Sequence, residues 1–246
     1  DLQKTNQIIN DLANLKVEIK VIADMYSILT GSVKMNSIFG ALLISVNPEI
    51  MPFWQKTIKR ILDLLISVIA IIILFPFFIV LAILIKFGSK GEIIFKQQRI
   101  GLGNKPFDIF KFRSMFLESE KNGPQLSSQN DPRITPIGRF MRKTRLDETP
   151  QFFNVIKGEM SLVGPRPERQ FYIDEIIKKA PHYKHISNVK PGITSWGQVK
   201  YGYAENVDEM IARLKFDLLY VENMSLVLDV KILFYTIIIM LKGSGK

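Results

Sequence analysis

The sequence contains no cysteine and only two histidines among its 246 residues. Without thiols the chain can form neither disulfides nor thiolate metal sites. The two histidines, His182 and His185, directly follow Pro181 and have no third imidazole to complete a ligand set. A histidine-based zinc site is therefore not expected, and both side chains are predicted to lie on the surface.

Negative charge is also scarce: 23 Asp or Glu stand against 33 Lys or Arg, a formal net charge of +10. The excess is concentrated between Lys96 and Arg145, with 11 basic residues against 4 acidic ones. Such a region suits anionic partners, which include phospholipid headgroups, nucleotide phosphates and nucleic acid. Nucleic-acid binders interleave basic and aromatic residues in recognisable modules, and we find none, so no nucleic-acid partner is expected.

Residues 61–85 form a long apolar run in which Asp63 is the single charge. As a helix this run would be ~37 Å long, enough to cross the ~30 Å hydrocarbon core of a bilayer. Basic residues flank both ends, which places both ends on one side of the membrane, and Pro76 supplies a bend. We therefore predict a re-entrant membrane hairpin over residues 53–90. A spanning helix and a buried core helix are the alternatives.

The remaining sequence divides into two parts. Residues 1–52 mix helix-like text with two short β-rich runs at 17–23 and 41–46, too few to close a sheet. We read them as the C-terminal remnant of an upstream Rossmann-like domain, and the chain as a truncated piece of a longer protein. Residues 91–246 are predicted to form a small mixed α/β domain with interfacial amphipathic helices, which makes the whole fold α+β.

Two adjacent acids, Asp147 and Glu148, follow a segment that carries Arg142, Lys143 and Arg145. Neighbouring carboxylates repel each other unless cations or a metal hold both ionised. A Mg²⁺ ion bound to substrate phosphates suits such a pair, because it often takes only one or two carboxylates. A carboxylate beside cations is also a competent nucleophile toward phosphorus. The pair is therefore a candidate catalytic and metal site, although an Asp-Glu dipeptide by itself is common.

Two further clusters carry candidate phosphate-binding cations. Pro165 and Pro167 enclose Arg166, so that the backbone presents the guanidinium in a fixed direction. Lys111 and Arg113 share one face of a predicted strand, because side chains on a strand alternate. A rigid surface turn and an ordinary amphipathic edge strand are the respective alternatives.

Taken together, these segments resemble the bacterial sugar transferase family, the monotopic phosphoglycosyl transferases that start surface glycan assembly. The resemblance extends from about Trp54 to the C-terminus. Besides the apolar run, the matching segments are 95–101 (FKQQRIG), 111–115 (KFRSM), 131–135 (DPRIT), 138–140 (GRF), 146–151 (LDETPQ), 154–155 (NV), 160–167 (MSLVGPRP), 190–194 (KPGIT) and 196–199 (WGQV). Residues 1–52 look like the end of the Rossmann-like domain of the longer members.

The resemblance implies a two-step transfer of sugar-1-phosphate from a UDP-sugar to polyprenyl phosphate, undecaprenyl phosphate in most bacteria. Asp147 would form a covalent phosphosugar intermediate and release UMP, while Glu148 helps to hold Mg²⁺. Arg142 and Arg166, with Lys111 and Arg113, would neutralise phosphates. The enzyme would work at an anionic phospholipid surface, on the cytoplasmic face of the inner membrane, in exopolysaccharide, capsule or O-antigen synthesis.

The sequence departs from the family pattern at two positions. Phe75 precedes Pro76 where many members have serine, and Arg145 replaces another common serine. Neither the sugar nor the oligomeric state can be read from the residues, and a homodimer is left open. Two other functions also stay open: a single-step transfer in which Asp147 acts as a base, and a non-enzymatic basic module on a membrane or nucleic acid.

Overall fold

The computed structural model describes Lys4, Ile8 and residues 19–22, 43–46, 51–117, 119, 123–127 and 131–241. The chain divides into two compact units, Asp1–Pro52 and Phe53–Lys246. In the first unit, β1 (Ile19–Ile22) pairs antiparallel with β2 (Leu43–Val46). The two predicted β-rich runs therefore do pair with each other. Their assignment to a Rossmann-like remnant stays a prediction, and most of the predicted first helix lies outside the described residues.

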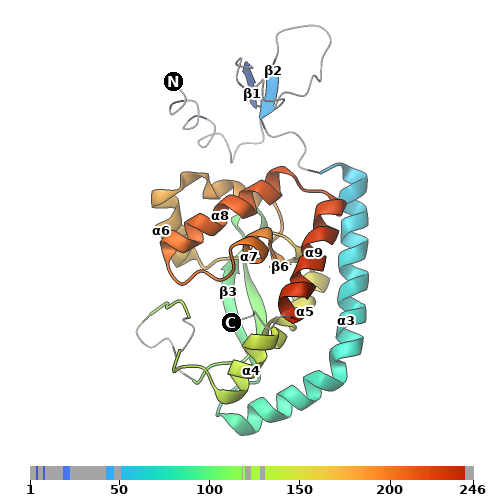
Figure 1. Cartoon of the computed structure of the whole chain (residues 1–246), viewed down its shortest axis with the longest axis vertical. Helices are drawn as coiled ribbons and strands as arrows, with labels where there is room; N and C mark the ends of the chain where they lie inside the picture. Colours follow the sequence, from blue (N-terminus) through green and yellow to red (C-terminus); the bar gives the residue numbers. More distant parts are fainter. Residues whose placement is uncertain are drawn as a thin grey trace. The chain divides into compact units, whose positions relative to one another are not determined.

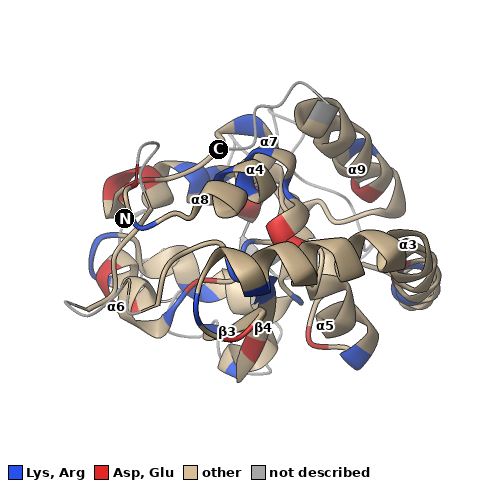
Figure 2. Cartoon of the chain, turned by 90° about the horizontal axis from the view of Figure 1, so that it is seen from below, with Lys and Arg blue, Asp and Glu red and all other residues tan. Residues whose placement is uncertain are grey.

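The second unit begins with α3 (Phe53–Gly88), a helix of 36 residues. Among the described helices it is the one that is long and apolar enough to cross a membrane. Pro76 lies inside it, where it removes the N–H that would bond the carbonyl of Ile72. Figure 1 shows α3 as two arms joined at a bend without an intervening loop. Most of its ribbon is uncharged in Figure 2. The re-entrant placement of this bent helix stays a prediction.

Charged side chains attach the first arm of α3 to the rest of the unit. The Asp63 carboxylate accepts hydrogen bonds from Ser161 Oγ (2.7 Å) and from the Leu162 N–H (3.1 Å). Lys59 Nζ lies 2.6 Å from Asp229 Oδ2 in α9 (Leu226–Leu241) and donates to a backbone carbonyl at 3.0 Å. The single charge in the apolar run therefore binds protein groups, which explains how a buried carboxylate is tolerated there.

The second unit contains a β-hairpin that follows α3 in the chain. β3 (Ile94–Ile100) and β4 (Pro106–Phe112) pair antiparallel, joined by the short 3₁₀ turn η1 (Leu102–Asn104). Gly103 in this turn has φ +65°, a conformation that glycine adopts without steric cost. The face of the hairpin that carries Phe112 packs on the second arm of α3 in a core cluster with Leu81, Ile85 and Met141. The hairpin is therefore packed directly against the long apolar helix.

The other elements surround this hairpin (Figure 1). A parallel pair of three-residue strands, β5 (Ser161–Val163) and β6 (Gly192–Thr194), lies between helices. The helices are α4 (Pro136–Thr144), α5 (Gln151–Lys157), α6 (Gln170–Lys179), α7 (Trp196–Lys200), α8 (Val207–Glu222) and α9, with 3₁₀ segments η2 (Leu146–Glu148) and η3 (Pro181–Asn188). The unit is thus a mixture of helices and small sheets with one long apolar helix, in agreement with an α+β class.

Candidate active site

The acid pair occupies the sharp turn that follows α4. Arg145 ends this helix in the left-handed conformation (φ 59°, ψ 17°), and its N–H bonds back to the carbonyls of Arg142 and Met141. The next residues form η2, which places Asp147 and Glu148 side by side and both largely buried, 7% and 8% exposed. A left-handed conformation costs a non-glycine residue ~1–2 kcal/mol. The structure therefore holds some backbone strain directly before the two acids.

Three cations converge on the carboxylate of Glu148. Lys111 Nζ lies 2.7 Å and Arg166 Nη2 3.3 Å from its Oε1, while Arg145 Nη1 lies 3.5 Å from Oε2. Burial alone would raise the pKa of Glu148, but these cations lower that pKa well below its usual range. Glu148 is therefore ionised, and its carboxylate is the group that all three cations contact.

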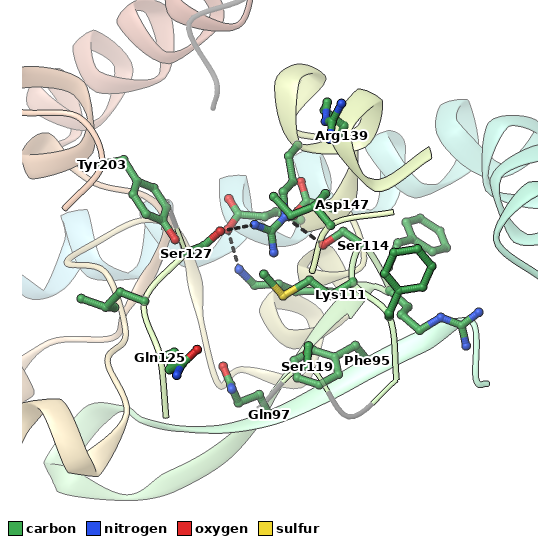
Figure 3. A pocket seen from close by; sticks show the side chains of 18 of the residues that line it. Phe95, Gln97, Lys111, Ser114, Ser119, Gln125, Ser127, Arg139, Asp147 and Tyr203 are labelled. Atoms are coloured by element: carbon green, nitrogen blue, oxygen red, sulfur yellow. Dashed lines mark hydrogen bonds and ion pairs between the residues drawn. The ribbon is translucent and has the colours of Figure 1, made fainter. Parts of the chain in front are cut away.

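Asp147 has a different environment. Burial and the neighbouring Glu148 charge raise the pKa of Asp147, against the opposite effect of nearby Lys111, Arg142 and Arg145. Within the described residues, no hydrogen-bond donor reaches its carboxylate, which lines a cavity of about 610 Å³. Figure 3 shows Asp147 and Lys111 at the centre of this cavity, with Tyr203 and Gln97 further out. A carboxylate that is buried, basic and unbonded is available to a ligand that enters the cavity.

Arg142 lines the same cavity and is held by neutral partners. Its Nε donates to Ser114 Oγ at 2.9 Å and its Nη1 to Ser127 Oγ at 2.6 Å. In the described part of the chain, no carboxylate forms an ion pair with this guanidinium, so its charge can act on an anionic ligand. Reasoning from the sequence did not identify either serine as a site residue. Ser114 lies inside the matching 111–115 segment, whereas nothing in the sequence distinguishes Ser127 within its polar loop.

Arg166 reaches the site from the turn that follows β5. The carbonyl of Pro165 accepts the Gly192 N–H at 2.9 Å, and that of Pro167 accepts Arg99 Nη1 at 3.2 Å. Both prolines lie outside the lining of the large cavity, whereas Arg166 is part of it. The structure therefore gives Pro165 and Pro167 a role in fixing the backbone, and leaves contact with a ligand to Arg166.

Arg113 lines the same cavity as Lys111 and Arg166, but its guanidinium does not contact Glu148 as theirs do. β4 ends at Phe112, and the guanidinium of Arg113 turns to the end of α3. It donates to the carbonyls of Ile85 (3.2 Å), Ser89 (2.7 Å) and Glu92 (2.6 Å). The last carbonyls of a helix lack partners within the helix, so a cation there stabilises the helix end. The contacts of Arg113 indicate that it secures α3.

The end of the cavity that is lined by Gln97 and Arg99 is polar. Arg99 bonds Gln97 Oε1 at 2.7 Å and lies 3.3 Å from Glu168, a buried acid that also pairs with Arg213 at 2.6 Å. Other lining residues at this end are Arg169, Tyr172 and Tyr203. Gln97 and Arg99 are two residues apart on β3, inside the matching 95–101 segment, and therefore share one face of the strand. This period-two spacing is the signal by which the sequence could have identified them.

The two acids differ in what they could offer a magnesium ion. Asp147 lines the cavity without a hydrogen-bond donor among the described residues, whereas both oxygens of Glu148 already contact cations. No group of three or more potential metal-ligating side chains occurs within the described residues. Mg²⁺ commonly keeps waters and takes most other ligands from substrate phosphates, so Asp147 fits such an ion better than Glu148 does, and the magnesium site stays a prediction.

The family model for bacterial sugar transferases matches residues 54–243. The chain belongs to this family. A relative from Aeromonas hydrophila, named UDP-N-acetylgalactosamine-undecaprenyl-phosphate N-acetylgalactosaminephosphotransferase, is 44% identical over 217 residues, which cover 88% of this chain and 51% of the relative. One from Escherichia coli K12, named UDP-glucose:undecaprenyl-phosphate glucose-1-phosphate transferase, is 32% identical over 240 residues, 96% and 52% of the two chains. The chain thus spans about half the length of these relatives.

Proposed function

We propose that this chain transfers a sugar-1-phosphate from a UDP-sugar to undecaprenyl phosphate and thereby starts exopolysaccharide, capsule or O-antigen assembly. The observation that carries the proposal is the unbonded, buried carboxylate of Asp147 in a cavity lined by cations, in a domain joined to an apolar helix. The names of the family relatives support both substrates. Because those names include different sugars, the sugar is left to experiment.

In the first step, a carboxylate oxygen of Asp147 attacks the β-phosphorus of the UDP-sugar. A bond forms between this oxygen and phosphorus, the bond from phosphorus to the bridging oxygen breaks, and UMP leaves with the electron pair. Lys111, Arg142 and Arg166 line the space that the diphosphate would occupy. Their charges stabilise the negative charge that develops on the transferred and leaving oxygens.

In the second step, a phosphate oxygen of the lipid acceptor attacks the same phosphorus. The phosphorus–Asp147 bond breaks, the carboxylate is regenerated, and the product is a polyprenyl diphosphate sugar. Asp147 and Glu148 are the residues that would hold Mg²⁺, which when bound would neutralise part of the diphosphate charge. Two displacements at one carboxylate let a water-soluble donor and a membrane-bound acceptor use the site in turn.

We further propose that α3 enters and leaves the same leaflet of the inner membrane, with the catalytic domain on the cytoplasmic face and in contact with anionic phospholipids. This is supported by the bend at Pro76 and by basic residues near both ends of the apolar run. Reporter tags placed at Asp1 and at Lys246 should both be cytoplasmic. Tags on opposite sides would establish a spanning helix instead.

The proposal is tested by incubating the purified chain with a panel of UDP-sugars and measuring UMP release. Asp147→Asn should abolish both UMP release and labelling of the protein by radioactive sugar phosphate. Asp108→Asn, which removes an exposed acid on β4, is the matched control and should leave both signals intact. Full turnover by Asp147→Asn would refute the nucleophile. Turnover by the native chain that leaves no trappable adduct would favour a single-step reaction with Asp147 as base.

A further inference from the structure

The lining of the large cavity changes from apolar to polar along one face of β3. Phe95, Gln97 and Arg99 are every second residue of this strand, so they share one face, and all three line the cavity. Phe95 lies at the end of β3 that is joined to α3, whereas Arg99 lies at the other end beside Glu168. The end of the cavity nearest α3 therefore carries Phe95, and the charge of Arg113, which also lines the cavity, is directed to carbonyls at the end of α3.

The segment after β4 completes this apolar end. Met115, Phe116 and Leu117 also line the cavity. Backbone contacts with the 131–135 segment hold the first two: Met115 bridges to Ile134, and the Phe116 N–H donates to a carbonyl at 2.9 Å. Phe95, Phe116 and Leu117 are 45%, 47% and 58% exposed. Large apolar side chains that are held in place yet half open to a cavity are available to an apolar ligand.

The apolar end is continuous with the end of α3. A Cβ added to Gly91, three residues beyond this helix, would meet Arg113 Nη1 first and would lie 2.9 Å from Leu117 Cδ2. Arg113 fixes the same region by bonding the carbonyls of Ile85 and Ser89. A chain that leaves the bilayer along the second arm of α3 would therefore reach Leu117 before it reaches the acids.

The distance to the acid pair suits a lipid with a charged head. Lys111 contacts Glu148, and the cavity lining continues from Lys111 through Leu117. Six residue steps of extended chain cover at most ~20 Å. A phosphate bound among the cations could therefore lay the first few isoprene units of its tail along this segment.

We infer that the apolar end of the cavity, formed by Phe95, Met115, Phe116 and Leu117, binds the phosphate-proximal hydrocarbon of the polyprenyl acceptor. The inference rests on the proposed function and adds the acceptor subsite to it. The polar end with Gln97, Arg99 and Tyr203 is left for the nucleotide sugar, because it offers the hydrogen-bonding groups that a nucleotide needs and the apolar end does not.

The test compares a Phe116→Ser/Leu117→Ser double variant with the native chain, both in nanodiscs. Each receives undecaprenyl phosphate or dimethylallyl phosphate, an acceptor with a single isoprene unit that offers far less hydrocarbon to these side chains. The KM for undecaprenyl phosphate should rise at least tenfold, and the KM for the short acceptor less than threefold. Leu102→Ser is the control, since Leu102 is 44% exposed in η1 and lies outside the cavity lining.

Two further measurements decide between explanations. UMP release without acceptor reports the donor step, and co-sedimentation with phosphatidylglycerol-containing vesicles reports membrane affinity. Equal KM changes for both acceptors, or a loss of vesicle binding that accounts for the change, would overturn the acceptor subsite. Loss of the donor step in the double variant would overturn it too. If the native chain releases no UMP from any UDP-sugar, the proposed function itself fails.

Discussion

Two clusters of buried charge in this domain have opposite degrees of internal bonding. In the cluster at the first arm of α3, Asp63 accepts hydrogen bonds on both oxygens, from Ser161 Oγ and a backbone N–H. Asp229 likewise uses both oxygens, for Lys59 and for the hydroxyl of Tyr220 at 2.7 Å. At the acid pair, Glu148 is similarly engaged, but Asp147 has no hydrogen-bond donor within the described residues. We call the first group, which consists of Lys59, Asp63, Asp229 and their hydrogen-bond partners, the anchor cluster.

The comparison shows that burial of charge does not by itself identify a reactive group. In the anchor cluster, every carboxylate oxygen is satisfied by the protein, so the cluster has nothing to offer a ligand and serves to attach α3. At the active site, the cations are held by Glu148 while the neighbouring Asp147 stays open to the cavity. A fully bonded acid positions the cluster, and an unbonded acid beside it is available to react.

Among the changes that leave Asp147 in place, Glu148→Gln has the largest expected effect, because it removes the carboxylate that all three cations contact. UMP release should fall roughly 100- to 1,000-fold, the scale seen when preorganised electrostatic groups are lost from active sites. Glu175→Gln, at an exposed acid paired with Lys178, is the matched control. Turnover within threefold of the native rate would show that Glu148 does not organise the site.

Lys59→Met tests the anchor cluster. Lys59 and Asp229 are 12% and 9% exposed, and loss of one partner of a buried pair costs about 3 kcal/mol or more. The free energy of unfolding of the detergent-solubilised chain should fall by that amount, and a second substitution, Asp229→Leu, should recover part of it. A loss below about 1 kcal/mol, typical of an exposed pair, would contradict a structural role for the cluster.

Proximity among the candidate site residues was easier to predict from the sequence than the anchor cluster. Asp147, Glu148, Lys111 and Arg166 lie in short segments whose residue types suggested phosphate chemistry, and the structure brings these side chains together. The partners of Asp63, by contrast, are 98 and 99 residues away along the chain. No local pattern reports such a pairing, so Asp63 could be predicted only as an isolated charge in an apolar run.

Arg113 shows what local periodicity leaves out. Alternation on a strand places Arg113 on the same face as Lys111, and both line the cavity, but the strand ends at Phe112. Beyond that point, the guanidinium donates to carbonyls at the end of α3 and in the residues that follow this helix. The end of an element that lies far away in sequence therefore fixed the role of this residue, and period-two reasoning had no access to it.

Arg145→Gly sharpens the comparison because stability and activity should respond differently. Glycine relieves the left-handed conformation at this position (φ 59°), but it also removes a cation that lies 3.5 Å from Glu148. We expect stability to stay within about 1 kcal/mol of the native value or to rise. Turnover should fall about tenfold, since one of three cations is lost.

Arg145→Lys separates the two contributions, because it keeps the charge as well as the strained backbone. This variant should recover most of the turnover that glycine loses, and its unfolding midpoint should stay close to the native one. If glycine and lysine lower turnover equally, the guanidinium geometry would be required and charge alone would not explain the effect.

Asp131→Asn has the smallest expected effect and concerns the loop that holds Ser127 beside Arg142. Asp131 accepts hydrogen bonds from the Arg133 backbone N–H (3.0 Å), Nε (2.8 Å) and Nη2 (2.6 Å). The Arg133 side-chain bonds prevail over desolvation and lower the pKa of Asp131 from 3.8 to about 2. Because the folded pKa lies below the ordinary value, the ionised form stabilises the fold above pH ~4, and this contribution is lost as the pH falls toward 2.

Urea unfolding between pH 2 and pH 6 measures this contribution. The native chain should be slightly more stable than Asp131→Asn at pH 6, and the difference should shrink to nothing near pH 2. A difference that stays constant across this range would assign the effect to side-chain packing and not to charge. The Lys59–Asp229 pair joins residues 170 apart, whereas Asp131 and Arg133 are 2 apart, and so the loop pair constrains far less of the fold.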